Sequence, residues 1–242
     1  RDPEMSRGLG DVYKRQLEDF FSAQKDLEKK KILITAGPTY EKIDPVRFIG
    51  NYSSGKMGFA LAEACAERGA EVTLVAGPVS LKTHHPAIKR IDVESAGEMY
   101  QAAMTAFPSS DAAILCAAVA DYRPENASEQ KIKRETEREM TLHLVPNPDI
   151  AASLGAIKRE GQVMVGFALE TNDEATHAEG KLKRKNLDFI VLNSLRDQGA
   201  GFRCDTNKIT IIDNAGGVTS YPLKTKREVA CDIVNKLVTL LK

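Results

Sequence analysis

Short apolar runs alternate with amphipathic stretches along most of the chain. Runs of Val, Ile, Leu and Ala that end at small residues are typical of buried strands, whereas apolar residues at every third or fourth position are typical of helices. Strands are expected at 31–37, 71–77, 88–95, 111–122 and 162–171, helices at 56–69, 96–108, 149–160 and 223–242, and a helix that leads into a strand at 177–194. This alternation predicts an α/β fold of Rossmann type, with a doubly wound, mainly parallel sheet covered by helices on both faces.

Three segments depart from the alternation. Residues 38–55 are read as a long polar loop between the first strand and its helix. Residues 123–146 are polar and charged and contain a short strand-like run at 140–145, so we expect an excursion away from the sheet. Residues 208–222 carry Asn-Ala-Gly-Gly between two alternating runs, which predicts a β-hairpin.

The first 29 residues are expected to lie outside the folded domain. Residues 1–16 have no hydrophobic period and an internal Met5, which is typical of a cloning remnant, a misassigned start or a flexible lead. Residues 17–29 are charged and weakly helical, as in a linker. The folded domain is therefore expected at 30–242.

Composition narrows the range of partners. The chain has 242 residues, enough for one α/β domain, and 34 basic residues balance 34 acidic residues. Without net charge, no bulk field attracts nucleic acid or an anionic membrane, so neither partner is expected. No apolar run reaches the roughly 18 residues of a membrane span. Four cysteines without metal-binding spacing fit the reducing cytoplasm, which is the expected location.

The segment before the first long helix nearly spells a phosphate-binding loop. Gly50, Gly55 and Lys56 have the spacing of such a loop, but Met57 stands where Ser or Thr would hold magnesium. The segment also follows a long loop rather than a strand, which disfavours a true P-loop. It nevertheless marks a helix N-terminus, whose N–H groups and dipole attract an anion. The candidate phosphate loop consists of Ser53, Ser54, Gly55 and Lys56, with Gly37 at the end of the first strand.

Two other interpretations of this segment stay open. The run Ser-Ser-Gly-Lys-Met-Gly resembles the glycine turn of short-chain dehydrogenases, which would make the chain an NAD(P)-dependent oxidoreductase. The second strand, however, ends in Leu-Val-Ala-Gly-Pro, without an acidic residue for a ribose hydroxyl or an arginine for a 2′-phosphate. The glycines can also serve the packing of helix against strand alone.

Several residues near the expected strand ends are candidates for ligand contact. Lys181 and Lys185 are four positions apart and share one helical face, so they could grip a polyphosphate or remain solvated. Asp121 could bind ribose hydroxyls or magnesium, or cap the following turn. Asp149 is expected to cap a helix, and Phe167 to lie in the core or against a base. No Ser/His/Asp set, nucleophilic cysteine or metal-binding histidine spacing is evident, which points to transfer between substrates by positioning and charge stabilisation.

Seven motifs together resemble one family. In chain order they are ITAGPT, DPVRFIGNYSSGKMG, AAVADY, KIKR, NPDI, VGFALET and KNLDFIVLN. This order is similar to that of phosphopantothenoylcysteine synthetases, most of all the bacterial CTP-dependent type, over residues 31–242. In that type the synthetase is usually the C-terminal half of a bifunctional coenzyme A enzyme, behind a flavin-dependent decarboxylase. A fused decarboxylase domain upstream is therefore a possible partner, but neither flavin nor decarboxylation is carried over to this chain.

The resemblance implies a ligase reaction. The carboxylate of 4′-phosphopantothenate attacks the α-phosphate of CTP and expels pyrophosphate, and the amine of L-cysteine then attacks the acyl-CMP intermediate to form an amide and release CMP. CTP is thus a co-substrate, and magnesium is expected to be held mainly by its triphosphate. The family pattern also implies a homodimer, with the excursion at 123–146 in the interface. Tyr52 and Arg134 depart from the pattern, which more commonly has His and Lys there.

The resemblance also implies roles for individual residues. Asn51 would hold the acyl-nucleotide intermediate, and Lys131, the first lysine of KIKR, would be a flap lysine that contacts the nucleotide and serves the second half-reaction. Lys181 and Lys185 would contact the triphosphate. The full set of nucleotide contacts implied by the motifs is Leu115, Cys116, Ala117, Asp121, Lys131, Pro148, Asp149, Ile150, Ala151, Phe167, Lys181 and Lys185.

Overall fold

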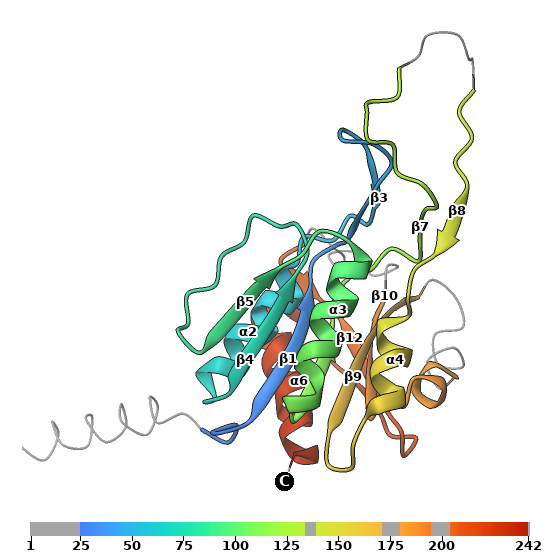
Figure 1. Ribbon diagram of the computed structural model, residues 1–242. Coiled ribbons are helices and arrows are strands. Elements are labelled where there is room, and N and C mark those ends of the chain that lie inside the picture. Colours follow the sequence, from blue (N-terminus) through green and yellow to red (C-terminus); the bar gives the residue numbers. More distant parts are fainter. Residues whose placement is uncertain (1–24, 134–138, 171–179, 195–203, 242) are drawn as a thin grey trace, which may run out of the picture.

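An eight-stranded sheet forms the centre of the computed structural model, which describes residues 25–133, 139–170, 180–194 and 204–241 (Figure 1). Six neighbouring strands run parallel: β5 (Ile88–Asp92), β4 (Glu71–Ala76), β1 (Lys31–Ala36), β6 (Ala112–Leu115), β9 (Val163–Glu170) and β10 (Phe189–Ser194). Next to β10, β12 (Ile209–Asp213) and β13 (Val218–Ser220) continue the sheet as an antiparallel hairpin. The expected mainly parallel sheet and its hairpin are confirmed.

Helices cover both faces of the sheet. α2 (Lys56–Glu67) and α6 (Lys226–Leu240) pack on one face. α3 (Ala96–Ala106), α4 (Ile150–Ile157) and the helical residues 180–184 pack on the other. Ile32 and Ile34 of β1 point into the first core and Leu33 into the second. Because both sides of the strand are buried, its sequence is a continuous apolar run.

The strand order reverses between β1 and β6. From β1 the chain continues to β4 and β5 at one edge, and it then returns past β1 to β6, β9 and β10. The loops that leave β1 and β6 therefore diverge, which opens a crevice at the carboxyl ends of these two strands. Proteins of this architecture bind their ligands in such a crevice.

Helix starts are of two kinds. Ser95 before α3 and Thr225 before α6 form capping boxes with Glu98 and Glu228, which satisfy the N–H groups of the first turn. α2 begins instead at Gly55, which has a left-handed conformation (φ 77°) and provides no side-chain cap. The first N–H groups of α2 therefore depend on partners other than a capping side chain.

The fourth strand is shorter than the sequence suggests. It was expected at 111–122, but β6 ends at Leu115 and residues 116–121 form a loop. Beyond Leu115 the pairing with the chain after β1 is reduced to a single isolated bridge, between Pro38 and Ala118, so the regular ladder stops there. Asp121 consequently lies in a loop and does not end a strand.

The expected polar loop at 38–55 contains a β-hairpin. β2 (Tyr40–Lys42) and β3 (Phe48–Gly50) are antiparallel. The buried carboxylate of Asp44 closes the turn by accepting hydrogen bonds from the N–H groups of Val46 and Arg47, both at 2.8 Å. Such a side-chain-to-backbone turn leaves no hydrophobic period in the sequence, which explains why the pattern missed it.

The excursion after β6 extends away from the sheet beside the β2–β3 hairpin (Figure 1). Its base is a ribbon of β7 (Tyr122–Pro124) and β8 (Leu144–Pro146), so the strand-like run at 140–145 is only partly a strand. Arg134 lies outside the described residues. The remaining short elements are η1 (Phe107–Ser109), β11 (Thr206–Asn207) and β14 (Lys224–Thr225).

The packed domain begins before β1. Leu27, which the sequence places in the linker, is fully buried in the core, and Asp26 forms an ion pair with Arg68 after α2. Residues 1–24, expected to be a lead and linker, lie outside the described residues. In the part of the chain that the structure describes, no helix combines the length and apolar character needed to traverse a bilayer.

Candidate functional site

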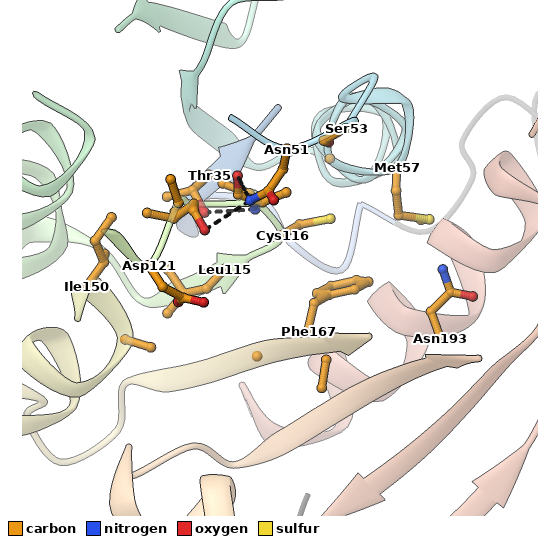
Figure 2. Close-up of a pocket in the computed structure, with 18 of the residues that line it drawn as sticks. Thr35, Asn51, Ser53, Met57, Leu115, Cys116, Asp121, Ile150, Phe167 and Asn193 are labelled. Atoms are coloured by element: carbon orange, nitrogen blue, oxygen red, sulfur yellow. Dashed lines mark hydrogen bonds between the residues drawn. The ribbon is translucent and has the colours of Figure 1, made fainter. Parts of the chain in front are cut away.

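A cavity of about 820 Å³ lies at the carboxyl ends of β1, β6, β9 and β10. These strands contribute Thr35, Leu115, Phe167 and Asn193 to its wall (Figure 2). The cavity thus lies where the strand order reverses, which is the position that the topology favours for a ligand. Its size is typical of pockets for small molecules and cofactors.

Most of the residues singled out from the sequence line this one cavity. They are Asn51, Ser53, Ser54, Gly55, Lys56, Leu115, Cys116, Ala117, Asp121, Pro148, Asp149, Ile150, Ala151, Phe167, Lys181 and Lys185. Gly37 does not line it but packs behind the phosphate loop, where Gly55 is a close neighbour. Lys131 does not line the cavity either.

Asn51 connects two loops of the cavity. Its amide nitrogen donates to the carbonyl oxygens of Ala118 at 3.0 Å and Val119 at 3.1 Å, in the loop that follows β6 (Figure 2). Both amide hydrogens are used in this way, so the side chain can offer a ligand only its oxygen. Asn51 is therefore held in one orientation as a hydrogen-bond acceptor.

The start of α2 approaches the end of β1 closely. A Cβ atom added at Gly58 would lie 2.5 Å from the Cβ of Ala36, and one at Gly55 would lie 3.1 Å from a methyl group of Val79. Gly37 also has a positive φ of 80°. The glycines thus allow the close packing of helix on strand, which is the packing role that the sequence left open for them. The same packing brings the first turn of α2, with its N–H groups, to the cavity wall.

A second helix start, that of α4, faces the cavity from the other side. Asp149 caps it by accepting the N–H of Ala152 at 3.0 Å, and Lys185 contacts the same carboxylate at 3.0 Å. Burial alone would raise the pKa of Asp149, but the Ala152 N–H and the Lys185 ammonium outweigh it, and the pKa lies below its ordinary value. Lys181 and Lys185 both line the cavity, as expected for two residues four positions apart on one helical face.

The thiol of the cavity wall is poorly suited to act as a nucleophile at neutral pH. Burial raises the pKa of Cys116 to about 12, so the side chain remains a neutral thiol. Among the described residues, no group of three or more His, Cys, Asp or Glu side chains is arranged to hold a metal ion. The lysines and the two helix starts of the wall can position and neutralise charged reactants.

Lys131 belongs to the excursion. The N–H of the next residue, Ile132, donates to Asp44 at 3.2 Å, and its carbonyl accepts from Arg47 at 2.9 Å. The segment is thereby fastened to the β2–β3 hairpin. The role of Lys131 as a flap lysine stays a prediction.

Sequence reasoning missed several polar residues of the cavity wall, namely Thr35, Asn147, Asn193, Asn207 and Lys226. Asn193 ends the run Phe-Ile-Val-Leu-Asn, so its position at a strand's carboxyl end was a usable signal. Asn207 and Lys226 carried no such signal, because the fold alone brings β11 and the start of α6 to the phosphate loop.

Comparison with known proteins gives one family. The family model described as the DNA/pantothenate metabolism flavoprotein C-terminal domain matches residues 27–241. A protein of an unknown prokaryotic organism, named cysteine/cysteine sulfinic acid decarboxylase, is 56% identical over 231 residues, which are 94% of this chain and 64% of that protein. The coenzyme A biosynthesis bifunctional protein CoaBC of Vibrio parahaemolyticus is 49% identical over 225 residues, 93% of this chain and 56% of that protein. The chain thus spans little more than half the length of these relatives.

Solved structures agree with this match. The C-terminal domain of a CoaBC protein is 40% identical, with a TM-score of 0.76 over 90% of this chain and 98% of that one. A Cab2 mutant in complex with phosphopantothenate-cysteine shares the fold, with a TM-score of 0.69 at 15% identity over 100% of this chain and 96% of that one. From the family match and these relatives, the chain belongs to the DNA/pantothenate metabolism flavoprotein C-terminal domain family.

Proposed function

We propose that the chain is a ligase that joins 4′-phosphopantothenate and L-cysteine, with CTP converted to CMP and pyrophosphate through an acyl-CMP intermediate. The observation that carries the proposal is the cavity itself. Two helix starts and the lysines at 56, 181 and 185 surround a fixed acceptor, Asn51, and the cavity thiol is neutral. Such a site suits a reaction in which the substrates supply the nucleophiles.

In the first half-reaction, a carboxylate oxygen of phosphopantothenate bonds to the α-phosphorus of CTP, and the bond to the leaving pyrophosphate breaks. All reactants are anionic, so lysines and helix N-termini lower the cost of bringing them together. Lys181 and Lys185 would neutralise the triphosphate, and magnesium would take most of its ligands from the triphosphate oxygens. The backbone of residues 115–117 would line the nucleotide.

In the second half-reaction, the cysteine nitrogen bonds to the acyl carbon, loses one proton, and expels CMP. The oxygen of Asn51 would accept a hydrogen bond from an N–H or O–H group of the bound intermediate. Because this oxygen is fixed by the bonds of its own amide group to the loop after β6, it can hold the intermediate in one orientation until the amine arrives.

The names of the relatives support a role in coenzyme A biosynthesis for this family. They disfavour an NAD(P)-dependent oxidoreductase, as does the end of β4, which offers neither an acidic residue nor an arginine to a nucleotide ribose. The decarboxylase name of one relative belongs to a longer protein, and we do not carry it over. We propose that in longer proteins of this family a flavin-dependent decarboxylase domain is fused upstream of the ligase domain.

We further propose that the ligase works as a homodimer. Exposed large apolar side chains gather on the β2–β3 hairpin and the excursion, namely Val46, Phe48, Tyr52, Tyr122, Ile132, Met140 and Leu144. A clustered apolar surface of this kind favours contact with another protein surface. A second copy that covers it would bring the excursion of one chain toward the cavity of the other.

The test is an assay with purified chain. Phosphopantothenate, L-cysteine, CTP and magnesium together should yield CMP, pyrophosphate and the amide product, and omission of cysteine should leave only a partial burst of pyrophosphate. L-cysteine alone should release no carbon dioxide, and NADPH should not bind in a fluorescence titration. Absence of the amide from the complete mixture, with the chain folded and dimeric, would overturn the proposal.

A further inference from the structure

A second cationic group lies on the α2 side of the cavity. Lys226 is the first residue of α6 and is only 7% exposed, yet it lines the cavity together with the phosphate loop. Its backbone N–H donates to the carbonyl of Asp205 at 2.9 Å, and its ammonium donates to the carbonyl of Cys204. These two bonds fix the lysine at the cavity wall.

A short ribbon joins this lysine to the start of α2. β11 and β14 are antiparallel, with Asn207 opposite Lys224, and α6 begins directly after β14. The ribbon is fastened to α2 twice: Lys56 forms an ion pair of 2.6 Å with Asp205, and the amide nitrogen of Asn207 lies 3.6 Å from the sulfur of Met57. Phosphate loop and ribbon therefore form one wall.

The polar atoms of this wall are incompletely satisfied. Asn207 is 2% exposed, and its side-chain oxygen has no hydrogen-bond partner among the described residues. The same holds for the side-chain oxygen of Asn193, which lies on β10 opposite Ile209, two residues beyond Asn207. Buried polar atoms are rarely left without a partner, so these two amide groups have hydrogen-bonding capacity that no described residue uses. An amide oxygen only accepts, so an anion would be bound here by the NH₂ end of a turned amide.

The charges of the wall favour an anion. Burial lowers the pKa of the Lys226 ammonium below its ordinary value, and the nearby Lys56 acts in the same direction, against Cys204, Asp205 and Cys116. Asp205 pairs with Lys56 at 2.6 Å, and the uncapped helix N-terminus beside the two ammonium groups adds further positive potential, which favours an anion at this wall.

We propose that Lys226 and Asn207 complete a phosphoryl-binding subsite at the start of α2. The donors available there are the two ammonium groups, the hydroxyls of the loop and the N–H groups of the first helical turn, and a phosphoryl group has three oxygens to engage them. A half-turn of the Asn207 amide presents its NH₂ to the ligand and gives up only the weak contact with the Met57 sulfur.

This subsite is distinct from the lysine pair at 181 and 185. Figure 2 shows Met57 and Asn193 on one side of Cys116, and Asp121 and Ile150 on the other. The subsite itself rests on the geometry. Which phosphoryl group it takes, the polyphosphate of the nucleotide or the phosphate of the pantothenate substrate, rests on the proposed function.

The test compares three variants by titration calorimetry with inorganic pyrophosphate. Lys226→Met should weaken binding roughly 10- to 100-fold, as expected for loss of a charged hydrogen bond, and Lys226→Arg should restore part of it. Lys224→Met is the matched control, since its ammonium pairs with Asp232 at 2.7 Å and does not line the cavity; its affinity should match the parent chain. Lys226→Met should melt no lower than the parent, because it removes a buried charge.

Two further titrations identify the source of the phosphoryl group. A loss of affinity for CTP alone assigns the subsite to the nucleotide, and a loss for phosphopantothenate but not for pantothenate assigns it to the substrate phosphate. Asn207→Asp, which places a negative charge in the wall, should weaken binding of whichever of these two ligands loses affinity in Lys226→Met. Unchanged affinities of folded Lys226→Met and Asn207→Asp for all three phosphate ligands would overturn the inference. Pyrophosphate binding needs no turnover, so this result is independent of whether the amide product forms.

Discussion

At the scale of single residues, the cavity depends on side chains with fixed hydrogen bonds. Asn51 was predicted from its motif, and the structure adds that its amide nitrogen is already committed to the carbonyls of Ala118 and Val119. Lys226 and Asn207 could not be predicted, because their neighbours in space are far away in sequence. Sequence motifs therefore predict the site residues that lie within them. The other site residues are known only from the contacts that the fold makes between distant segments.

Asn51→Asp should lower turnover by about 100- to 1,000-fold, the usual effect of removing one positioned polar group. A carboxylate at this position would face two carbonyl oxygens and the anionic intermediate, so it is repelled from both. The measurement is the rate of amide formation at saturating substrates.

The control for this change is Asn214→Asp, the same substitution in the exposed hairpin turn, which should leave the rate unaltered. Normal turnover of Asn51→Asp, in a chain that melts at the parent temperature, would remove Asn51 from the mechanism.

Cys116→Ser should change turnover by no more than about twofold to threefold. Burial raises the pKa of Cys116 to about 12, which disfavours the reactive thiolate at neutral pH, and the nucleotide is expected to contact the backbone of Cys116. Iodoacetamide at pH 7 should label the exposed Cys231 well before Cys116, as read by mass spectrometry. Inactivation that follows the labelling of Cys116 would contradict this assignment.

At the scale of elements, helix starts and strand ends determine the cavity. The alternation of strands and helices was predictable because buried strands and amphipathic helices leave different hydrophobic periods. The end of β6 and the β2–β3 hairpin were not, because they depend on how residues 116–121 pair with the distant chain after β1 and on the turn at Asp44. The loop after β6 lines the cavity, and the β2–β3 hairpin holds the excursion at Ile132.

Asp149→Ala should lower the free energy of unfolding by about 1 kcal/mol, the usual cost of losing an N-cap. Asp149→Asn keeps an acceptor for the Ala152 N–H and should retain most of that stability, although it loses the ion pair with Lys185. Urea unfolding of both variants makes the comparison. Equal destabilisation by Ala and Asn would show that the charge, and not the cap, stabilises the start of α4.

At the scale of the whole molecule, stability should fall in acid. The hydrogen bond from Arg47 holds the pKa of Asp44 well below its usual range, against burial and with help from the N–H groups of Val46, Arg47 and Ile132. A depressed pKa in the folded state stabilises the protein above the unfolded pKa, at about pH 4, and this contribution is lost as the pH falls further.

Asp44→Asn should therefore melt at a lower temperature than the parent at pH 7, and the difference should shrink below about pH 4. Glu160→Gln, at an exposed position, is the control and should follow the parent at every pH. A constant difference between Asp44→Asn and the parent over this range would contradict the assignment.

The proposed dimer predicts complementation between two inactive variants. Lys131 lies on the excursion, outside the cavity wall of its own chain, so we expect it to serve the partner's cavity. An equal mixture of Asn51→Asp and Lys131→Gln chains, unfolded and refolded together, should recover about one quarter of the parent activity, because half of the dimers are hybrids with one intact site.

Recovery should depend on dimer formation. Phe48→Glu, which charges the exposed apolar surface, should give monomers by light scattering and abolish complementation. A mixture that stays inactive although hybrid dimers form would place Lys131 and Asn51 in the same chain's site.

The cavity takes Thr35 from its first strand and Lys226 from its last helix, and this span has a consequence for synthesis. While the chain grows on the ribosome, the parallel strands can assemble as they emerge, but the wall beside α2 stays open until the ribbon and the final helix arrive. A nascent chain therefore gains this affinity for its phosphorylated ligands only after α6 has emerged, and products that terminate before α6 should be unable to sequester them.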